Sequence, residues 1–265
     1  MGSAVRFTNR IALLLQVSAC LIIWPGNSFA YRPFDSTDAA VADVGELEIE
    51  LGPAGFRRSD TERTVIAPAY VINYGFAKNW EFVLEGKGEH PRSPAEDIRS
   101  RLINNGLFLK GVLQEGALQN KSGPSVATEF GVLLPGINDE HGVGASWLGI
   151  VSQRWSWGTI HFNVGATLTR EQRAGLFVGT VIEGPYDWKV RPVAEVVYER
   201  EFSTNEKFSV LSGVIWRVRD NLSFDIGLRE AWINRRPETE LRAGLTFAFS
   251  VRQEAIQRSG QLLGR

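Results

Sequence analysis

The chain has 265 residues, of which 43% are hydrophobic and 22% are charged, and its formal net charge at pH 7 is -1. Its mean hydropathy of -0.12 is ordinary for a soluble protein, but a membrane β-barrel dilutes its apolar face with polar residues and gives a similar average. The near balance of charge excludes the strongly basic character of a nucleic-acid-binding protein.

The N-terminus has the layout of a secretory signal. Arg6 and Arg10 precede an apolar run over residues 11–24, and small residues at Ser28 and Ala30 fit a cleavage site. The run is too short for an ordinary transmembrane helix. We therefore expect residues 1–30 to be a signal peptide that is removed after export.

A second pattern in the same region is the stretch VSAC, which ends at Cys20 and is similar to the motif before a lipid-modified cysteine. The apolar run continues past Cys20 to Trp24, and this continuation favours the ordinary signal peptide. Cleavage after Ala30 removes the only cysteine of the chain. Thiol catalysis and cysteine metal sites are then excluded in the mature protein.

After the signal, the chain alternates apolar and polar residues in runs of about ten, separated by turn residues, as membrane barrels do. The even number of runs fits a barrel with both ends in the periplasm. The twelve runs are 45–51, 63–76, 79–89, 105–115, 125–134, 144–154, 158–169, 175–183, 188–200, 207–217, 221–230 and 238–249.

The connections between these runs also alternate in length. Short turns follow most even-numbered runs, whereas longer polar stretches follow most odd-numbered runs. Short periplasmic turns and long external loops are typical of outer-membrane barrels. The stretch GALQNKSGP, residues 116–124, breaks this rule because it should be short.

The stretch WGTIHFNVGATLTR, residues 157–170, raises the question of which strand face points inward. Phe162 belongs to an apolar face and His161 to a polar one. A soluble sandwich would bury the apolar face, whereas a membrane barrel would turn it to lipid.

Aromatic residues favour the barrel. Tryptophan prefers the membrane–water interface, and a cluster at one rim is typical of an aromatic girdle rather than of a sandwich core. The expected interface residues are Trp80, Trp155, Trp157, Trp188, Trp216 and Phe249.

We therefore predict an all-β protein with an antiparallel up-and-down transmembrane β-barrel of about 12 strands. A periplasmic N-terminal segment would span residues 31–44, the barrel residues 45–249, and a periplasmic tail residues 250–265. A soluble secreted β-sandwich is the alternative fold.

Charged residues on the polar faces are expected to line the lumen together with His161. The nine acids predicted there are Glu46, Glu48, Glu50, Glu81, Glu85, Glu129, Glu195, Glu199 and Asp225. The six bases are Lys110, Lys189, Arg191, Arg217, Arg229 and Arg242. This excess predicts a net negative wall that prefers cations or neutral amphiphiles. A salt-bridge lattice that fills a narrow barrel is the competing interpretation.

Other polar residues give weaker signals. The stretch NDEHG, residues 138–142, could bind a cation, but it is more typical of a polar loop tip. Asp35 and Asp38 could touch a ligand or the barrel interior, and a flexible polar leader is favoured instead. No nucleophile elbow, phosphate loop or zinc-type histidine pair is present, so no catalytic residue, metal or cofactor is expected.

Two segments carry a family resemblance. RPFDSTDAAVADVGELEIELG, residues 32–52, resembles the start of mature chains in the outer-membrane family named for the MetA pathway of phenol degradation. Residues 216–249 are similar to the closing hairpins of that family. The resemblance implies passage of small compounds, including aromatic ones, across the outer membrane. The chain departs from the family by continuing past Phe249, where barrels commonly end.

The function expected from these features is passive passage of small aromatic or amphipathic solutes through a monomeric outer-membrane barrel. Outer-membrane lipid and the barrel-assembly machinery are the expected partners, and no nucleic acid is expected. The alternative is a closed structural or surface-binding barrel without transport.

Overall fold

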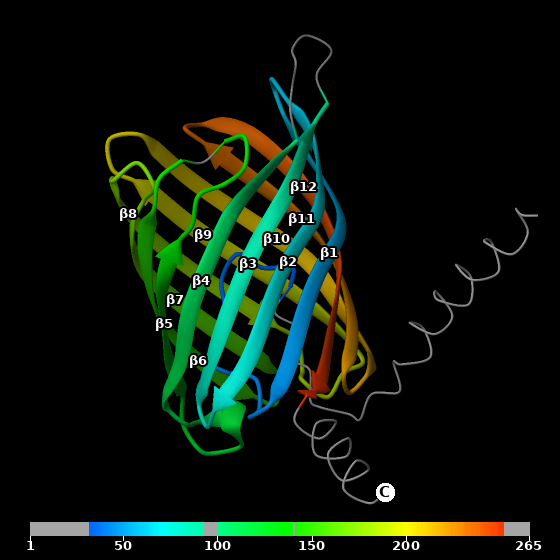
Figure 1. Ribbon diagram of the computed structural model, residues 1–265. Helices are drawn as coiled ribbons and strands as arrows, with labels where there is room; N and C mark the ends of the chain where they lie inside the picture. Colours follow the sequence, from blue (N-terminus) through cyan, green and yellow to red (C-terminus); the bar gives the residue numbers. More distant parts are fainter. Residues whose placement is uncertain (1–31, 93–99, 140, 252–265) are drawn as a thin grey trace, which may run out of the picture.

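The computed structural model describes residues 32–92, 100–139 and 141–251, and these form a closed antiparallel barrel of 12 strands (Figure 1). The sequence prediction of an all-β, up-and-down barrel is confirmed. Each strand pairs with its neighbours in the chain, and β1 pairs with β12 to close the wall. The strands are β1 (Glu46–Ser59), β2 (Arg63–Ala77), β3 (Trp80–Pro91), β4 (Arg101–Gln114), β5 (Ser125–Leu133), β6 (Gly144–Trp155), β7 (Gly158–Leu168), β8 (Ala174–Glu183), β9 (Val190–Glu201), β10 (Asn205–Arg219), β11 (Leu222–Ile233) and β12 (Arg236–Ser250).

The two faces of the wall differ in chemistry. On β7, Phe162 is 44% exposed on the outside, whereas its neighbour His161 is 3% exposed and points inward. The same alternation gives the barrel an apolar exterior, as lipid contact requires. The exposed apolar residues of the strands include Phe82, Leu84, Leu107, Phe130, Val132, Phe162, Val164, Val196, Val214, Phe224, Ile226 and Leu228.

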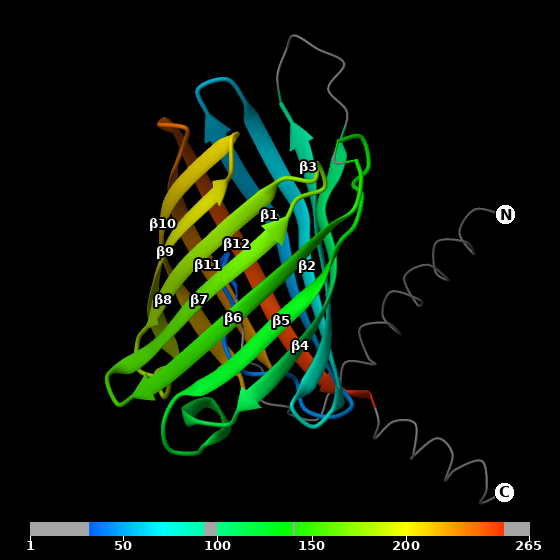
Figure 2. The ribbon, with the colours of Figure 1, turned by 90° about the vertical axis from the view of Figure 1, so that its left-hand side faces the viewer.

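The barrel has two unlike rims. We call the end where even-numbered strands finish the turn rim, and the opposite end the loop rim; Figure 2 shows them at the bottom and top. Trp155 and Trp157 stack at the turn rim with ring centroids 5.4 Å apart. Trp188 and Trp216 are exposed at the same rim, while Trp80 is half-buried there. This arrangement matches an interfacial aromatic belt.

Several strands are longer at the loop rim than the sequence pattern predicts. β1 extends to Ser59 rather than ending at Leu51, and its pairing with β12 shifts between Leu51 and Ala54. Pro53 lies within this irregularity, where it fits the strand because proline is tolerated at bulges. β4 and β12 likewise begin earlier than expected, at Arg101 and Arg236.

The connection between β4 and β5 is long, although the other connections at the turn rim are short. It contains the 3-10 helix η1 (Ala117–Gln119), whose Leu118 is buried.

Among the described residues, no helix is long and apolar enough to cross a bilayer. The predicted signal peptide and most of the predicted C-terminal tail lie outside the described residues.

Replacement of Phe162 by arginine tests the assignment of the outer face. A cation facing lipid near mid-strand costs about 2–4 kcal/mol, so we expect Phe162→Arg to fold less efficiently into the heat-modifiable barrel seen on unheated gels. Phe162→Leu is the matched control and should fold like the unmodified chain. Equal folding of Phe162→Arg would contradict a lipid-facing position.

Candidate functional site: a segment bound inside the lumen

Residues 32–44, which we call the lumen segment, lie inside the barrel. The blue trace in Figure 1 crosses the interior before it joins β1 at the turn rim. The segment has no regular secondary structure, and Ala39 and Ala40 within it are buried. A backbone without strand or helix partners must find other hydrogen bonds inside a protein.

Side chains of the wall supply many of these bonds. The Glu195 carboxylate on β9 accepts hydrogen bonds from the backbone N–H groups of Asp35, at 3.0 Å, and Ser36, at 2.7 Å. Asn163 on β7 accepts from the Thr37 N–H at 2.9 Å and donates to the Thr37 carbonyl at 2.8 Å. Two wall residues thus hold three consecutive residues of the lumen segment.

The unusual β4–β5 connection holds the next part of the segment. Gln119 donates a hydrogen bond to the Ala39 carbonyl at 2.8 Å. Leu118 packs in a small apolar cluster with Ala39 and Ile150. On the other side, the Ala39 N–H donates to Ser152 Oγ at 3.0 Å. The connection that breaks the length rule therefore binds the lumen segment.

Asp35 is the main ionic anchor. Its carboxylate lies 2.7 Å from Arg242 Nη2, 3.0 Å from Arg229 Nη1 and 3.4 Å from Lys207 Nζ. Burial acts to raise the pKa of Asp35, but Arg242, Lys207 and Arg229 outweigh it and lower that pKa well below its ordinary value. Asp35 is therefore ionised at neutral pH.

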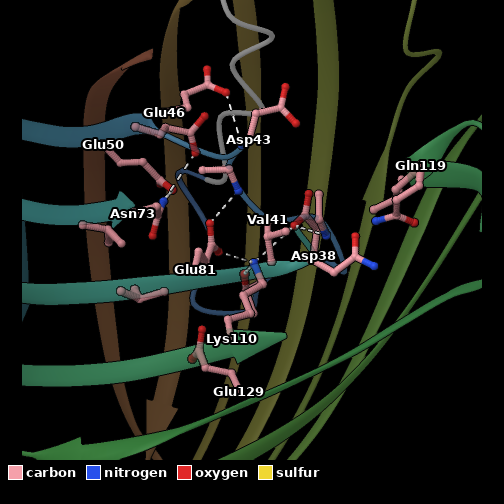
Figure 3. A pocket seen from close by; sticks show the side chains of 18 of the residues that line it. Asp38, Val41, Asp43, Glu46, Glu50, Asn73, Glu81, Lys110, Gln119 and Glu129 are labelled. Atoms are coloured by element: carbon pink, nitrogen blue, oxygen red, sulfur yellow. Dashed lines mark hydrogen bonds and ion pairs between the residues drawn. The ribbon is translucent and has the colours of Figure 1, made fainter. Parts of the chain in front are cut away.

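A second ionic contact lies nearer the turn rim, where Lys110 on β4 faces the segment (Figure 3). Lys110 Nζ is 3.5 Å from Asp38 and 3.4 Å from Glu81. Glu81 in turn accepts a hydrogen bond from the Ala42 N–H at 2.7 Å. Asp38 of the lumen segment and Glu81 of β3 thereby share the buried ammonium group of Lys110.

Glycines in the wall make room for the segment. A Cβ at Gly52 would lie 2.6 Å from Arg32 Nη2, and a Cβ at Gly244 would overlap the same guanidinium. A Cβ at Gly179 would overlap Ser36 Oγ. Larger residues at these inward positions would therefore require the Arg32 and Ser36 side chains to move.

The prediction of a flexible polar leader is wrong for Asp35 and Asp38. Both side chains form ion pairs with the wall, and Asp38 is buried. The segment lies within the barrel rather than beyond its rim. The physical reason is that the inner wall offers donors and acceptors that complement an irregular backbone.

The lumen segment separates two cavities. The turn-side cavity has a volume of about 610 Å³ and the loop-side cavity one of about 420 Å³. Arg32, Phe34 and Asp35 of the segment line both cavities, as do Val71 and Glu85 of the wall, so residues 32–35 lie between the two cavities. A further cavity of about 580 Å³ lies at the loop rim and shares Lys207 with the loop-side cavity.

Most of the predicted lumen residues fall into three groups. Glu46, Glu48, Glu50, Glu81, Glu85, Lys110 and Glu129 line the turn-side cavity, and Glu85 also lines the loop-side cavity. Glu199, Arg229 and Arg242 line the loop-side cavity. His161, Arg191, Glu195 and Asp225 are buried in the wall.

Lys189 and Arg217 differ from expectation because both lie at the turn rim. Lys189 is exposed there, since β9 begins at Val190, two residues after the predicted start at Trp188. Arg217 is half-buried and donates a hydrogen bond to the Asp187 carbonyl at 3.3 Å.

Buried contacts hold the wall residues that line neither of the two main cavities. His161 Nδ1 is 2.8 Å from Ser152 Oγ, and His161 Nε2 is 3.5 Å from Glu183 Oε1. Asp225 lies 3.7 Å from Arg32 Nε of the lumen segment. Within the described ranges, no group of three histidine, cysteine or acidic side chains is placed to hold a metal ion.

Sequence reasoning missed four residues that bind the segment: Gln119, Ser152, Asn163 and Lys207. Ser152, Asn163 and Lys207 lie on strands, at inward-facing positions that alternate with outward ones in the same way as the predicted lumen charges. The signal for Gln119 was the excessive length of its connection. Selecting inward amides and hydroxyls as well as charges would have found the others.

Comparison with solved structures places this fold among outer-membrane barrels. The COG4313 outer membrane channel from Pseudomonas putida F1 has a TM-score of 0.58 and 10% identity, covering 82% of this chain and 100% of its own. The KdgM porin has a TM-score of 0.53 and 11% identity, covering 76% of this chain and 98% of its own. No family model matches the chain, and no curated protein sequence matches it.

A cross-link tests the position of the lumen segment. With Cys20 replaced by alanine, Ser36→Cys and Gly179→Cys should form a disulfide on mild oxidation, because a Cβ at position 179 would touch the residue 36 side chain. Ser36→Cys with Gly244→Cys is the matched control, since position 244 faces Arg32. Cross-linking is measured by gel mobility before and after reduction. Equal yields in both pairs would contradict the observed path of the segment.

Proposed function

We propose that the protein is an outer-membrane channel for small solutes, and that the lumen segment closes its passage in this structure. The observation that carries this proposal is the pair of cavities on opposite sides of one irregular segment. Movement of residues 32–35 would join these cavities. Neither strand pairing nor barrel closure depends on that segment.

The contacts of the segment suit reversible closure. They are mainly hydrogen bonds and ion pairs to side chains such as Glu195, Asn163 and Arg242. Water or a polar solute can replace such contacts at a modest net cost per bond, whereas a continuous apolar core offers no such exchange. The apolar contacts of the segment are confined to small clusters.

The charges of the turn-side cavity favour cations or neutral amphiphiles as solutes. Ten acidic and four basic residues line this cavity. Glu46, Glu48 and Glu50 lie on one strand, where Glu46 and Glu50 are buried and Glu48 is half-buried. Fixed charges act strongly on ions in a narrow passage, so the acidic excess opposes small anions there.

A closed structural or surface-binding barrel is the second candidate function. It is favoured by ion pairs near the loop rim, where Glu89 lies 2.6 Å from Arg57 and 2.8 Å from Arg101. Arg101 also lies 3.0 Å from Asp139 in the connection that follows β5. Such a network stiffens the wall and would suit a barrel that does not conduct.

The proposed location follows from the apolar exterior and the aromatic belt. We expect a monomer in the bacterial outer membrane, delivered by the signal peptide and inserted by the barrel-assembly machinery. The resemblance of residues 32–52 to the MetA-pathway family supports small aromatic or amphipathic compounds as solutes. Membership of that family is part of this proposal.

Closure by the segment is tested with the Ser36→Cys, Gly179→Cys chain in a planar bilayer. The oxidised protein should pass little current, because the disulfide fixes the segment to β8. Reduction should restore conductance to that of the unmodified chain. The oxidised and reduced unmodified chain, which has no cysteine pair, is the control and should not differ.

Two outcomes would contradict this account. Equal currents in the oxidised and reduced double variant would mean that the segment does not control passage. Absence of current in both states and in the unmodified chain would favour the closed structural barrel.

Membrane orientation has a separate test. His141→Cys lies in the connection after β5, and Asp220→Cys lies in the turn after β10. An impermeant thiol reagent should label position 141 on intact cells and position 220 only after the membrane is opened. Equal labelling of both positions on intact cells would contradict the proposed orientation.

A further inference from the structure

Two neighbouring side chains of the lumen segment bind the wall in different ways. The ring of Phe34 packs on the apolar side chains of Val193 and Ile215. The carboxylate of Asp35 binds the basic cluster, which we define as Lys207, Arg229 and Arg242. An aromatic ring and a carboxylate are therefore held side by side on strands β9 to β12.

The apolar part of this surface lies between charged side chains. Val193 is 5% exposed and Ile215 is 0% exposed, and Val193 stands between the buried Arg191 and Glu195 on the inward face of β9. The strands place Ile215 opposite both Arg191 and Asp225. Phe34 thus covers a small apolar area that would otherwise face a wet lumen.

The basic cluster presents several hydrogen-bond donors to one place. Arg242 Nη2 and Arg229 Nη1 bind the two oxygens of Asp35, at 2.7 and 3.0 Å. Arg242 Nη1 also donates to the Pro33 carbonyl at 2.6 Å. Guanidinium groups on both carboxylate oxygens form the geometry by which proteins recognise carboxylates.

Wall carboxylates balance the charge of this cluster but do not use all of its donors. Glu240 binds Arg242 Nε at 2.8 Å and also pairs with Arg229, Glu238 lies 3.2 Å from Arg229 Nη2, and Glu199 lies 3.2 Å from Lys207. The arginine nitrogens that bind Asp35 and Pro33 are separate from these wall contacts. Removal of the segment would leave these donors without protein acceptors at the edge of the loop-side cavity, whose volume of about 420 Å³ suits a small ligand.

We propose that the basic cluster, together with Val193 and Ile215, is a binding site for a small carboxylate that carries an aromatic or apolar group. Phe34 and Asp35 occupy this site as an internal substitute for that ligand. The proposal rests on the proposed channel function, because it names the ligand that competes with the closing segment.

The direction of approach follows from the charges. The acid-rich turn-side cavity disfavours an anion, whereas the loop-side cavity has six basic and five acidic residues, including Arg32 and Asp35 of the segment. A carboxylate therefore reaches the site from the loop rim and displaces Asp35. Its binding weakens the attachment of the segment, because one ligand replaces both the ionic and the apolar contact.

Binding is measured by calorimetry on the full chain in detergent micelles, with phenylacetate as the probe. Asp35→Asn removes the competing carboxylate, so we expect it to bind phenylacetate about tenfold more tightly than the unmodified chain does. Acetate lacks the ring and benzyl alcohol lacks the charge, so both should bind more weakly. Asp220→Asn, in the exposed turn after β10, is the matched control and should bind like the unmodified chain.

The donors are tested in the Asp35→Asn chain. Addition of Arg242→Gln should abolish the gain in affinity. If that variant fails to fold, Lys207→Met replaces it and should reduce the gain. The proposal is overturned if Asp35→Asn binds no more tightly than the unmodified chain. It is also overturned if inorganic phosphate or acetate binds as well as phenylacetate, because the site would then recognise a simple anion.

A second readout separates this site from the channel function. Phenylacetate should increase the rate at which a thiol reagent modifies Ser36→Cys in micelles, since the segment is released. Binding and release without conductance would support the site and contradict the channel. Conductance that is controlled by the segment, with no phenylacetate binding, would support the channel and contradict the site.

Discussion

Hydrogen bonding of an irregular backbone inside a closed wall is the constraint on which the interior depends. A barrel satisfies its own strand groups completely, but residues 32–44 bring further N–H and carbonyl groups into the lumen. Glu195, Asn163 and Ser152 provide partners for those groups. Without these side chains the segment would be more stable in water, and the lumen would lose its partition.

The same constraint explains why the inner wall is not uniformly charged. Carboxylates near the turn rim share Lys110, whereas arginines on β11 and β12 meet Asp35. An acid-rich region and a region of nearly balanced charge therefore face opposite sides of the lumen segment. A solute that crosses the barrel encounters two different electrostatic environments, and the segment lies where they meet.

The wall could be predicted from the sequence because strand alternation is a local property. Phe162 and His161 already indicated their faces through residue type alone, and the rim tryptophans distinguished a barrel from a sandwich. The lumen segment could not be predicted in this way. It has no periodicity, and its partners Glu195 and Asn163 lie more than 120 residues away in the chain, at separations of 160 and 126. Its traces in the sequence were the long β4–β5 connection and the two acids Asp35 and Asp38, for which contact with the barrel interior was the alternative to a flexible leader.

Hydrogen exchange in lipid nanodiscs tests whether the lumen segment is bound to the wall. The amides of Asp35, Ser36, Thr37 and Ala39 are bonded to wall side chains, so we expect exchange far slower than in an unfolded peptide. Glu195→Ala should accelerate exchange at residues 35 and 36 while the strand amides stay protected. Exchange of residues 35–39 at the rate of a free peptide in the unmodified chain would contradict a segment bound in the lumen.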